Sequence, residues 1–581
     1  MWSLDWRNSS ERAVRYSASM SVGFLLPRAT SCCAFVLLAL GCASEGVSKR
    51  PGETGAPVHD ASSHLMIAEI ALQRGEYNVA ATEYVKAAQL STEPALAEQA
   101  TRVAFENRQE SAAVAGARRW LELEPANVDA HRHLAVATLR LHVLDQSVAH
   151  FEPVLQTAYA SPAEGFADLS STLAEEDNAY GVLWVTRGLA ARYPKLAQAH
   201  YAVGAAALRA YNYELAATSA RKALALDPGT EDAERLLARA LVVSGRTDAG
   251  LEIARRRVAT SNDIPSRLEL TLLQSAANEE EAARAELNAL LELPDARPEA
   301  LRTLASLDLA AGKLDDAAAR FNELLSTGRY VSLAFYSLGI IYERRRDPQR
   351  AIRYYSRVAS GAYATDALLR SARLLAGTGE RDQAIQLLDA YAQDHPESEV
   401  ELALGRARLL AEEGAADSAL EILDAQVTRY PDNLPLRFAR GVTLERMGRV
   451  DDAVSSLREL LALRPGDPVV MNALGYTLTE HKLELREAHS LIRKSLEMTP
   501  DSPAVQDSMG WVLHRMGQNR DALGWLTRAY AEEKDGEIAA HLGETLWALG
   551  QQSQARAIWD QAIAQEPDHR YLLNTLRRYP D

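Results

Sequence analysis

The sequence predicts an all-α protein, a superhelical solenoid of helical hairpins, and three features of its 581 residues support this prediction. From residue 64 onward Ala, Leu, Glu and Arg dominate, and these residues favour helix. Apolar residues recur at steps of three and four, the period of a helix with one buried face. Prolines follow helical segments at spacings near 34 residues or multiples of it, which is typical of repeat proteins; they are Pro194, Pro228, Pro396, Pro431, Pro465, Pro500 and Pro567.

The segment FYSLGIIYERRRDPQRAIRYYSRV, residues 335–358, fits the tetratricopeptide (TPR) repeat place by place. The W, L, G, Y, A and F places of that repeat are taken by Phe335, Leu338, Gly339, Tyr342, Ala351 and Tyr355. Other segments keep the same register through Gly204, Ala216, Ala223 and Pro228; Gly441, Ala453 and Pro465; Met509, Gly510, Leu513, Ala522 and Leu526; and Gly543, Ala555, Trp559 and Pro567. We therefore predict a TPR array.

Small residues at the eighth and twentieth places let the two helices of a hairpin approach closely, and a proline ends the second helix. The chain between residues 65 and 568 has room for about 14 or 15 such hairpins. Residues 161–192 and 265–294 keep the small-residue places poorly, so we expect degenerate hairpins there. Because each hairpin contacts mainly its neighbours, residues 64–570 are expected to form one continuous solenoid, with residues 571–581 as a tail.

The N-terminal segment MSVGFLLPRATSCCAFVLLALGC, which begins at Met20, is typical of a secretory signal. Its apolar run at residues 34–40 is far shorter than the roughly 20 residues of a membrane-spanning helix. The ending LALG before Cys42 resembles the lipobox of bacterial lipoproteins, so we expect residues 1–41 to be removed and Cys42 to be lipidated. Cleavage by an ordinary signal peptidase is the alternative.

The only cysteines are Cys32, Cys33 and Cys42, so the mature chain would keep just the lipidated one. Residues 42–63 are rich in Gly, Pro and Ser, and we predict that they form a flexible tether with an end-to-end distance of roughly 25 Å. No other window of 18 residues is apolar enough to span a bilayer, so membrane attachment is expected through Cys42 alone.

Composition and motifs argue against several classes of function. The formal net charge of −16 argues against binding of nucleic acid or an anionic membrane surface. The sequence contains no phosphate-binding GxxxxGK[ST], no HExxH and no GxSxG. His131 and His133, two residues apart, would point to different faces of a helix. We predict no catalytic residue, cofactor or metal, and no enzymatic activity.

Because we predict no enzymatic activity, we expect the protein to act through a binding surface, and the repeat register indicates where that surface lies. Places 5, 9 and 12 of each first helix form a stripe that packing does not use, and this stripe lines the inner groove of a TPR solenoid. In the C-terminal repeats the stripe and the next place give the candidate groove-binding residues Phe438, Arg446, Asn472, Tyr476, Asp507, Trp511, His514, Arg515, Glu544 and Trp547. Alternatively, Trp511 and Trp547 pack between neighbouring first helices.

The signatures NALGYTLTEH, DSMGWVLHRMG and AAHLGETLWALG, together with the lipobox and tether, resemble a family of proteobacterial TPR lipoproteins. One member of that family is an outer-membrane lipoprotein that binds a periplasmic carboxyl-terminal processing protease and brings it to substrates, including peptidoglycan hydrolases. The resemblance implies a non-catalytic adaptor without cofactors. Ala43 and Ser44 after the lipidated cysteine are similar to the pattern of lipoproteins sorted to the outer membrane, where the chain would face the periplasm.

Two other functions fit the same features. The first is an assembly lipoprotein for outer-membrane protein insertion, pilus assembly or polysaccharide export. The second is a general peptidoglycan-associated scaffold. The sequence does not indicate an oligomeric state.

Overall fold

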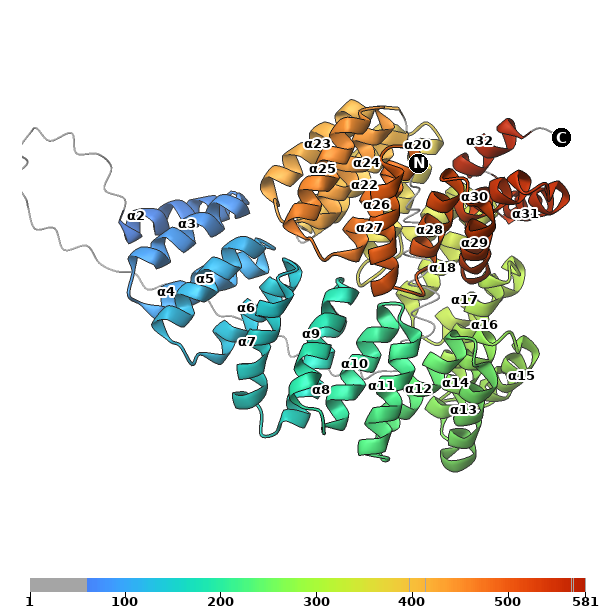
Figure 1. The fold of residues 1–581 in the computed structure, drawn as a ribbon, viewed down its shortest axis with the longest axis horizontal. Helices are drawn as coiled ribbons and strands as arrows, with labels where there is room; N and C mark the ends of the chain where they lie inside the picture. Colours follow the sequence, from blue (N-terminus) through green and yellow to red (C-terminus); the bar gives the residue numbers. More distant parts are fainter. Residues whose placement is uncertain (1–59, 396–397, 413, 566, 568, 580–581) are drawn as a thin grey trace, which may run out of the picture.

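The computed structural model describes residues 60–395, 398–412, 414–565, 567 and 569–579, and most of them are helical (Figure 1). The first half of the chain contains α2 (Ala61–Gln73), α3 (Tyr77–Leu90), α4 (Pro94–Glu106), α5 (Glu110–Leu123), α6 (Val128–Arg140), α7 (Leu144–Thr157), α8 (Pro162–Ala174), α9 (Ala179–Arg192), α10 (Ala197–Arg209), α11 (Tyr213–Leu226), α12 (Glu231–Val243), α13 (Thr247–Ser261), α14 (Ile264–Ala276), α15 (Glu280–Leu291), α16 (Arg297–Ala310) and α17 (Leu314–Ser326). The second half contains α18 (Val331–Arg344), α19 (Pro348–Tyr355), α20 (Ala364–Gly377), α21 (Arg381–Asp394), α22 (Glu399–Glu412), α23 (Ala416–Arg429), α24 (Leu434–Arg446), α25 (Val450–Leu463), α26 (Pro468–Glu480), α27 (Leu485–Met498), α28 (Pro503–Arg515), α29 (Asn519–Glu532), α30 (Gly536–Ala548), α31 (Gln552–Gln565) and α32 (Arg570–Arg578). No described residue lies in a β-strand.

Among the described residues the helices follow one another as fifteen hairpins, from α2 and α3 to α30 and α31, and then α32; the two helices of each hairpin pack directly on each other, except α8 and α9. This confirms the all-α TPR solenoid and its expected number of repeats. Two glycines in the eighth place pack as the register predicts: a Cβ on Gly475 would lie 2.6 Å from Cγ1 of Ile492, and one on Gly510 would lie 2.5 Å from Cγ of Leu526. Each of these glycines therefore lets the second helix pack against the first at close range.

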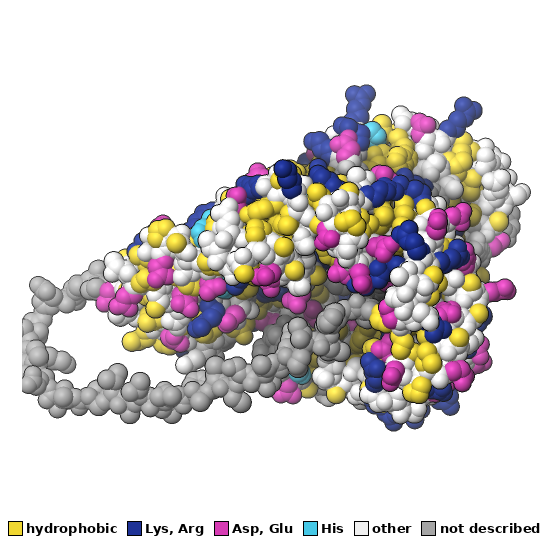
Figure 2. Space-filling model, turned by 90° about the horizontal axis from the view of Figure 1, so that it is seen from below, with side chains coloured by type: hydrophobic (Ala, Val, Ile, Leu, Met, Phe, Trp, Pro, Cys, Tyr) yellow, Lys and Arg dark blue, Asp and Glu magenta, His cyan; other side chains and the backbone are white. Residues whose placement is uncertain are grey.

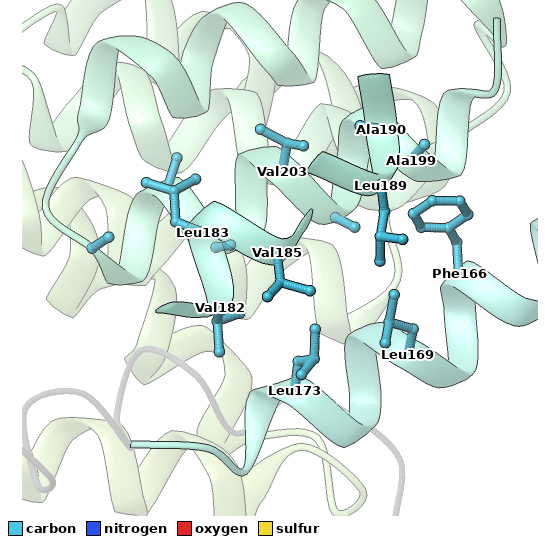
Figure 3. Packing of buried hydrophobic residues seen from close by; sticks show 14 of the residues in the cluster. Phe166, Leu169, Leu173, Val182, Leu183, Val185, Leu189, Ala190, Ala199 and Val203 are labelled. Atoms are coloured by element: carbon cyan, nitrogen blue, oxygen red, sulfur yellow. The ribbon is translucent and has the colours of Figure 1, made fainter. Parts of the chain in front are cut away.

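The hairpin predicted to be degenerate at residues 161–192 departs from this pattern. Leu169 occupies the place of the small residue in α8, and α8 and α9 lack the close backbone approach of the other hairpins. Phe166, Leu169 and Leu173 on α8 instead meet Val185 and Leu189 on α9 across a layer of side chains (Figure 3). Large apolar residues thus replace close backbone packing, and the solenoid stays continuous through this hairpin.

The superhelix turns far enough to bring its later hairpins back beside its earlier ones, and Figure 1 shows α23–α27 next to the N-terminal helices. The turns within hairpins on the first superhelical turn meet the connections between hairpins on the next. Ser111 N–H donates to Asp432 Oδ2 over 2.9 Å, and Gln109 Nε2 donates to the carbonyl oxygen of Arg429 over 3.2 Å. We call this the turn-to-turn contact; it comprises Gly75, Gln109, Ser111, His142, Tyr211 and Tyr213 on one side and Arg429, Asp432, Asp467 and Asp501 on the other.

Further hydrogen bonds extend the turn-to-turn contact along the chain. Asp501 N–H donates to the carbonyl oxygen of Tyr211 over 2.9 Å, and its carboxylate accepts from Tyr213 N–H over 3.0 Å. The side chain of His142 is buried, and its Nδ1 lies 3.8 Å from Oδ2 of Asp467. Burial lowers the pKa of His142, so it faces Asp467 as a neutral ring at pH 7. Hairpins that are eight to ten repeats apart in sequence are therefore neighbours in space.

The predicted signal, lipidated Cys42 and nearly all of the tether lie outside the described residues. Within the described part of the chain, no helix combines the length and the apolar character needed to cross a membrane.

Candidate functional site

The last three hairpins gather polar and aromatic side chains around Trp511 on α28. We call this group the C-terminal cluster; it comprises Tyr476, Glu480, Asp507, Trp511, Glu537, His541 and Tyr571. The Trp511 side chain is fully buried, its ring lies 3.9 Å from that of His541 between centroids, and its Nε1–H donates to Glu480 Oε2 over 2.9 Å. Trp511 therefore joins α26, α28 and α30 through one stack and one hydrogen bond.

His541 lies at the centre of the cluster's charges. Its Nδ1 is 3.0 Å from Asp507 Oδ1, and its Nε2 is 3.1 Å from the hydroxyl of Tyr571 on α32. Burial alone would lower the pKa of His541, but the adjacent Asp507 carboxylate raises it above the usual value. Burial raises the pKa of Glu537, which accepts a hydrogen bond from the Tyr476 hydroxyl. These buried ionisable groups thus have partners of opposite charge or hydrogen-bond donors.

Two further predicted residues also contact the Trp511 ring. The Arg515 guanidinium lies 4.3 Å from the Trp511 ring centroid, a cation–π contact. His514 stacks on Trp511 with centroids 5.0 Å apart, and its Nδ1 is 3.2 Å from Thr545 Oγ1. Burial, with Arg515 adding to it, lowers the pKa of His514 to about 4, so this ring is neutral at pH 7.

Glu544 and Trp547, both on α30, contact the C-terminal helix instead of the C-terminal cluster. Glu544 Oε1 accepts from Arg578 Nη2 over 2.5 Å. The half-buried Trp547 ring lies 5.9 Å from that of Trp559 and 5.3 Å from that of Tyr579. The end of α32 therefore covers α30 and closes the last hairpin of the array.

The remaining predicted residues lie on α24 and α26. Phe438 lines a small pocket of about 10 Å³ together with Gly441 and Glu445. Arg446 is exposed at the end of α24. Asn472 is buried, and its Oδ1 has no hydrogen-bond partner among the described residues.

The structure thus brings Tyr476, Asp507, Trp511, His514 and Arg515 together, and the other candidates lie elsewhere on α24, α26 and α30. The buried rings of Tyr476 and Trp511 link neighbouring first helices, which matches the packing interpretation for Trp511 in this conformation. The half-buried and exposed candidates, Phe438, Arg446, His514, Arg515 and Trp547, are the ones a partner could touch. Groove binding by these residues stays a prediction.

Four members of the C-terminal cluster were missed from sequence: Glu480, Glu537, His541 and Tyr571. Glu480 follows place 12 of its helix directly, as do the arginines that were included, so the register could have indicated it. Tyr571 belongs to the segment expected as a tail, which contains most of α32. Among the described residues, no group of three or more His, Cys, Asp or Glu side chains could hold a metal ion.

Comparison with known protein families agrees with this architecture. Models of the tetratricopeptide repeat match residues 302–367, 366–398 and 410–475. Among solved structures, yeast Tom70 covers 79% of this chain and 96% of its own at 14% identity and a TM-score of 0.33. The APC/C hetero-tetramer Cut9-Hcn1 covers 90% of this chain and 97% of its own, at 14% identity and a TM-score of 0.31.

A relative of nearly equal extent is the TPR repeat-containing protein PA4667 of Pseudomonas aeruginosa. It is 30% identical over 529 residues, which cover 85% of this chain and 84% of the relative. An identity of this level over nearly the whole array shows common descent, and TPR arrays serve protein–protein interaction. The chain therefore belongs to the family of TPR repeat-containing proteins.

Proposed function

We propose that this protein is a non-catalytic adaptor of the bacterial cell envelope, which holds a carboxyl-terminal processing protease and its substrates on one scaffold. The observation that carries the proposal is the set of C-terminal signatures at residues 472–481, 507–517 and 539–550, which resemble those of the adaptor lipoproteins. The substrates on this proposal are peptidoglycan hydrolases. The TPR array supports the broader part of the proposal, which is a scaffold for protein partners.

The fold provides a physical mechanism for such an adaptor. Protease and substrate bound at separate hairpins of one array would meet at an effective concentration that reaches the millimolar range for short connections. Cleavage then accelerates without any catalytic residue on the scaffold. Fifteen hairpins provide both an inner groove and an outer face for the two proteins.

The proposed location is the periplasmic face of the outer membrane. A lipid on Cys42 would anchor the chain, and the tether of residues 42–63 would hold the solenoid roughly 25 Å from the lipid surface. Replacement of Cys42 by Ser tests the anchor alone: labelled fatty acid is incorporated into the original chain and not into the variant, which is released in soluble form. Equal incorporation into both chains would reject lipidation at this residue.

The first experiment is affinity capture from envelope extract with the chain from Ala43 onward, which keeps every described residue, followed by reconstitution. The proposal expects recovery of a carboxyl-terminal processing protease, and faster cleavage of a purified hydrolase when the adaptor is added. The control is the same protease and hydrolase without adaptor. An unchanged hydrolase half-life at saturating adaptor would reject the mechanism, and recovery of insertion, pilus or export components without a protease would favour the assembly function.

A further inference from the structure

One hairpin carries a charge opposite to that of the whole protein. Residues 331–363 contain six arginines and two acidic residues, a net charge of +4 in a chain whose formal net charge is −16. Acidic and basic side chains are interspersed over the face that Figure 2 shows. The arginines are Arg344, Arg345, Arg346, Arg350, Arg353 and Arg357, all at the end of α18 or on and just after α19.

Aromatic rings order these guanidinium groups. The rings of Tyr342 and Tyr354 stack with centroids 5.2 Å apart and an interplanar angle of 8°. The guanidinium groups of Arg345 and Arg350 lie 5.2 and 5.4 Å from the centroid of the Tyr342 ring. That of Arg357 lies 5.9 Å from the Tyr354 ring and 5.5 Å from a third ring, Phe335. Contacts of this kind hold the charged groups at defined positions and lower the entropy lost on binding.

Part of this positive charge is not neutralised by the protein. Arg345 pairs with Asp315, and Arg350 pairs with Asp347 over 3.3 Å in an exposed i,i+3 pair. Arg353 and Arg357, both exposed, have no carboxylate partner in the described part of the chain. Their N–H groups are therefore available for the paired hydrogen bonds that guanidinium makes to carboxylates.

The local fold leaves this surface open. α19 has 8 residues, whereas its neighbours α17 and α21 have 13 and 14, and residues 356–363 follow it without a helix. α19 is also the second helix of its hairpin, so it does not line the inner groove formed by first helices. The arginines on and after α19 are thus separate from the candidate groove residues at the C-terminal end.

We propose that this arginine–tyrosine surface, formed by Tyr342, Arg350, Arg353, Tyr354 and Arg357, binds an acidic segment of a partner protein. Three features favour this occupant: the local charge is complementary, planar guanidinium groups recognise carboxylates in pairs, and rings beside them accept apolar side chains of the same segment. The surface gives the scaffold a second attachment point outside the groove. The proposal does not depend on which protease or assembly factor the groove serves.

The test uses fluorescent polyglutamate as the probe and the chain from Ala43 onward. Replacing Arg353→Glu and Arg357→Glu together is expected to weaken binding about tenfold at low salt. The matched control reverses the same charge at Arg221 and Lys222, which are exposed on α11, and is expected to change binding less than twofold. Unaltered thermal unfolding of both variants establishes that folding is intact.

A second measurement maps the contact. Polyglutamate is expected to protect Arg353 and Arg357 from phenylglyoxal, as read by mass spectrometry, and to leave Arg221 unprotected. Equal weakening in the two charge-reversed variants, or no protection of Arg353 and Arg357, would overturn the proposal. Tighter binding of oligothymidylate or of anionic lipid vesicles than of polyglutamate at this surface would overturn it in favour of another class of partner.

Discussion

Glycines in the eighth place of the repeat provide a test of how close packing holds a hairpin together. In Gly475→Ala the new methyl group would lie 2.6 Å from Cγ1 of Ile492 and 3.1 Å from the carbonyl oxygen of Ala488. Ordinary carbon contacts are about 3.5–4.0 Å, so α26 and α27 must separate by about 1 Å. Ile492 is fully buried and β-branched, so it has little freedom to move aside.

The expected cost follows from these distances. Overpacking of this size costs about 1–3 kcal/mol, and the gain in helix propensity from Gly to Ala returns up to about 1 kcal/mol. We therefore expect Gly475→Ala to lower the stability of α26 and α27 by about 1–2 kcal/mol. Gly441 occupies the same place on α24, but its nearest neighbour, Cγ of Leu457, would lie 3.8 Å from the new methyl group. Gly441→Ala should thus stabilise its hairpin by up to about 1 kcal/mol.

Amide hydrogen exchange read by mass spectrometry is the suitable assay, because hairpins of a repeat array open locally and a single melting temperature averages over them. Gly475→Ala should speed exchange in α26 and α27, and Gly441→Ala should slow exchange in α24 and α25. If both variants slowed exchange, close contact at the eighth place would not limit the approach of the two helices. Our account of the register would then be wrong.

Three further changes test the C-terminal cluster and the turn-to-turn contact. The pKa of His514 is about 4 in the folded chain and near 6.5 in the unfolded chain, so the free energy of unfolding falls as the pH drops from 6.5 towards 4. Between pH 7 and pH 5 the original chain should lose about 2 kcal/mol more of this free energy than His514→Gln, as measured by urea unfolding. Trp511→Ala should destabilise the last hairpins by about 3–5 kcal/mol and lower their melting temperature, whereas lost partner binding with unchanged melting would show a groove site instead. Arg429→Ala removes the guanidinium that donates to the carbonyl oxygen of Gly75 and should raise the radius of gyration in X-ray scattering. Arg440→Ala breaks only the exposed pair with Asp424, between α24 and α23, and should not change the radius of gyration.

The hairpins could be predicted from sequence because each depends on residues within about 34 places of each other. Glycines such as Gly475 and Gly510 occupy a fixed place in the period, and the loss of that place at Leu169 marked a hairpin whose helices lack close backbone approach. The expectation of a second degenerate hairpin at residues 265–294 was wrong, because α14 and α15 pack closely on each other. Of the predicted groove residues five, Trp511 among them, lie together in the structure, and groove binding by them stays a prediction. The sequence did not determine whether a ring such as that of Trp511 faces solvent or the next first helix, because this depends on the distance between neighbouring first helices.

The turn-to-turn contact could not be predicted from a pattern of residues within one repeat. Asp432 and Ser111 are 321 residues apart, and Asp501 and Tyr213 are 288 apart. Their approach depends on small rotations between hairpins that accumulate over eight or more repeats, and the sequence of one repeat does not reveal such a rotation. The same holds for Tyr571, whose contact with His541 depends on α32 folding back against the last hairpin.

Contacts between successive superhelical turns change how this array can serve as a scaffold. In an open solenoid each hairpin affects only its neighbours, so a partner bound at one end leaves the other end unchanged. Here the hydrogen bonds at Asp432 and Asp501 tie early hairpins to late ones, so the width of the inner groove and the integrity of the contact vary together. A partner that needs a wider groove must break these bonds and binds more weakly for that reason, whereas one that fits the closed form stabilises them. We therefore expect the turn-to-turn contact to favour partners that fit the closed groove.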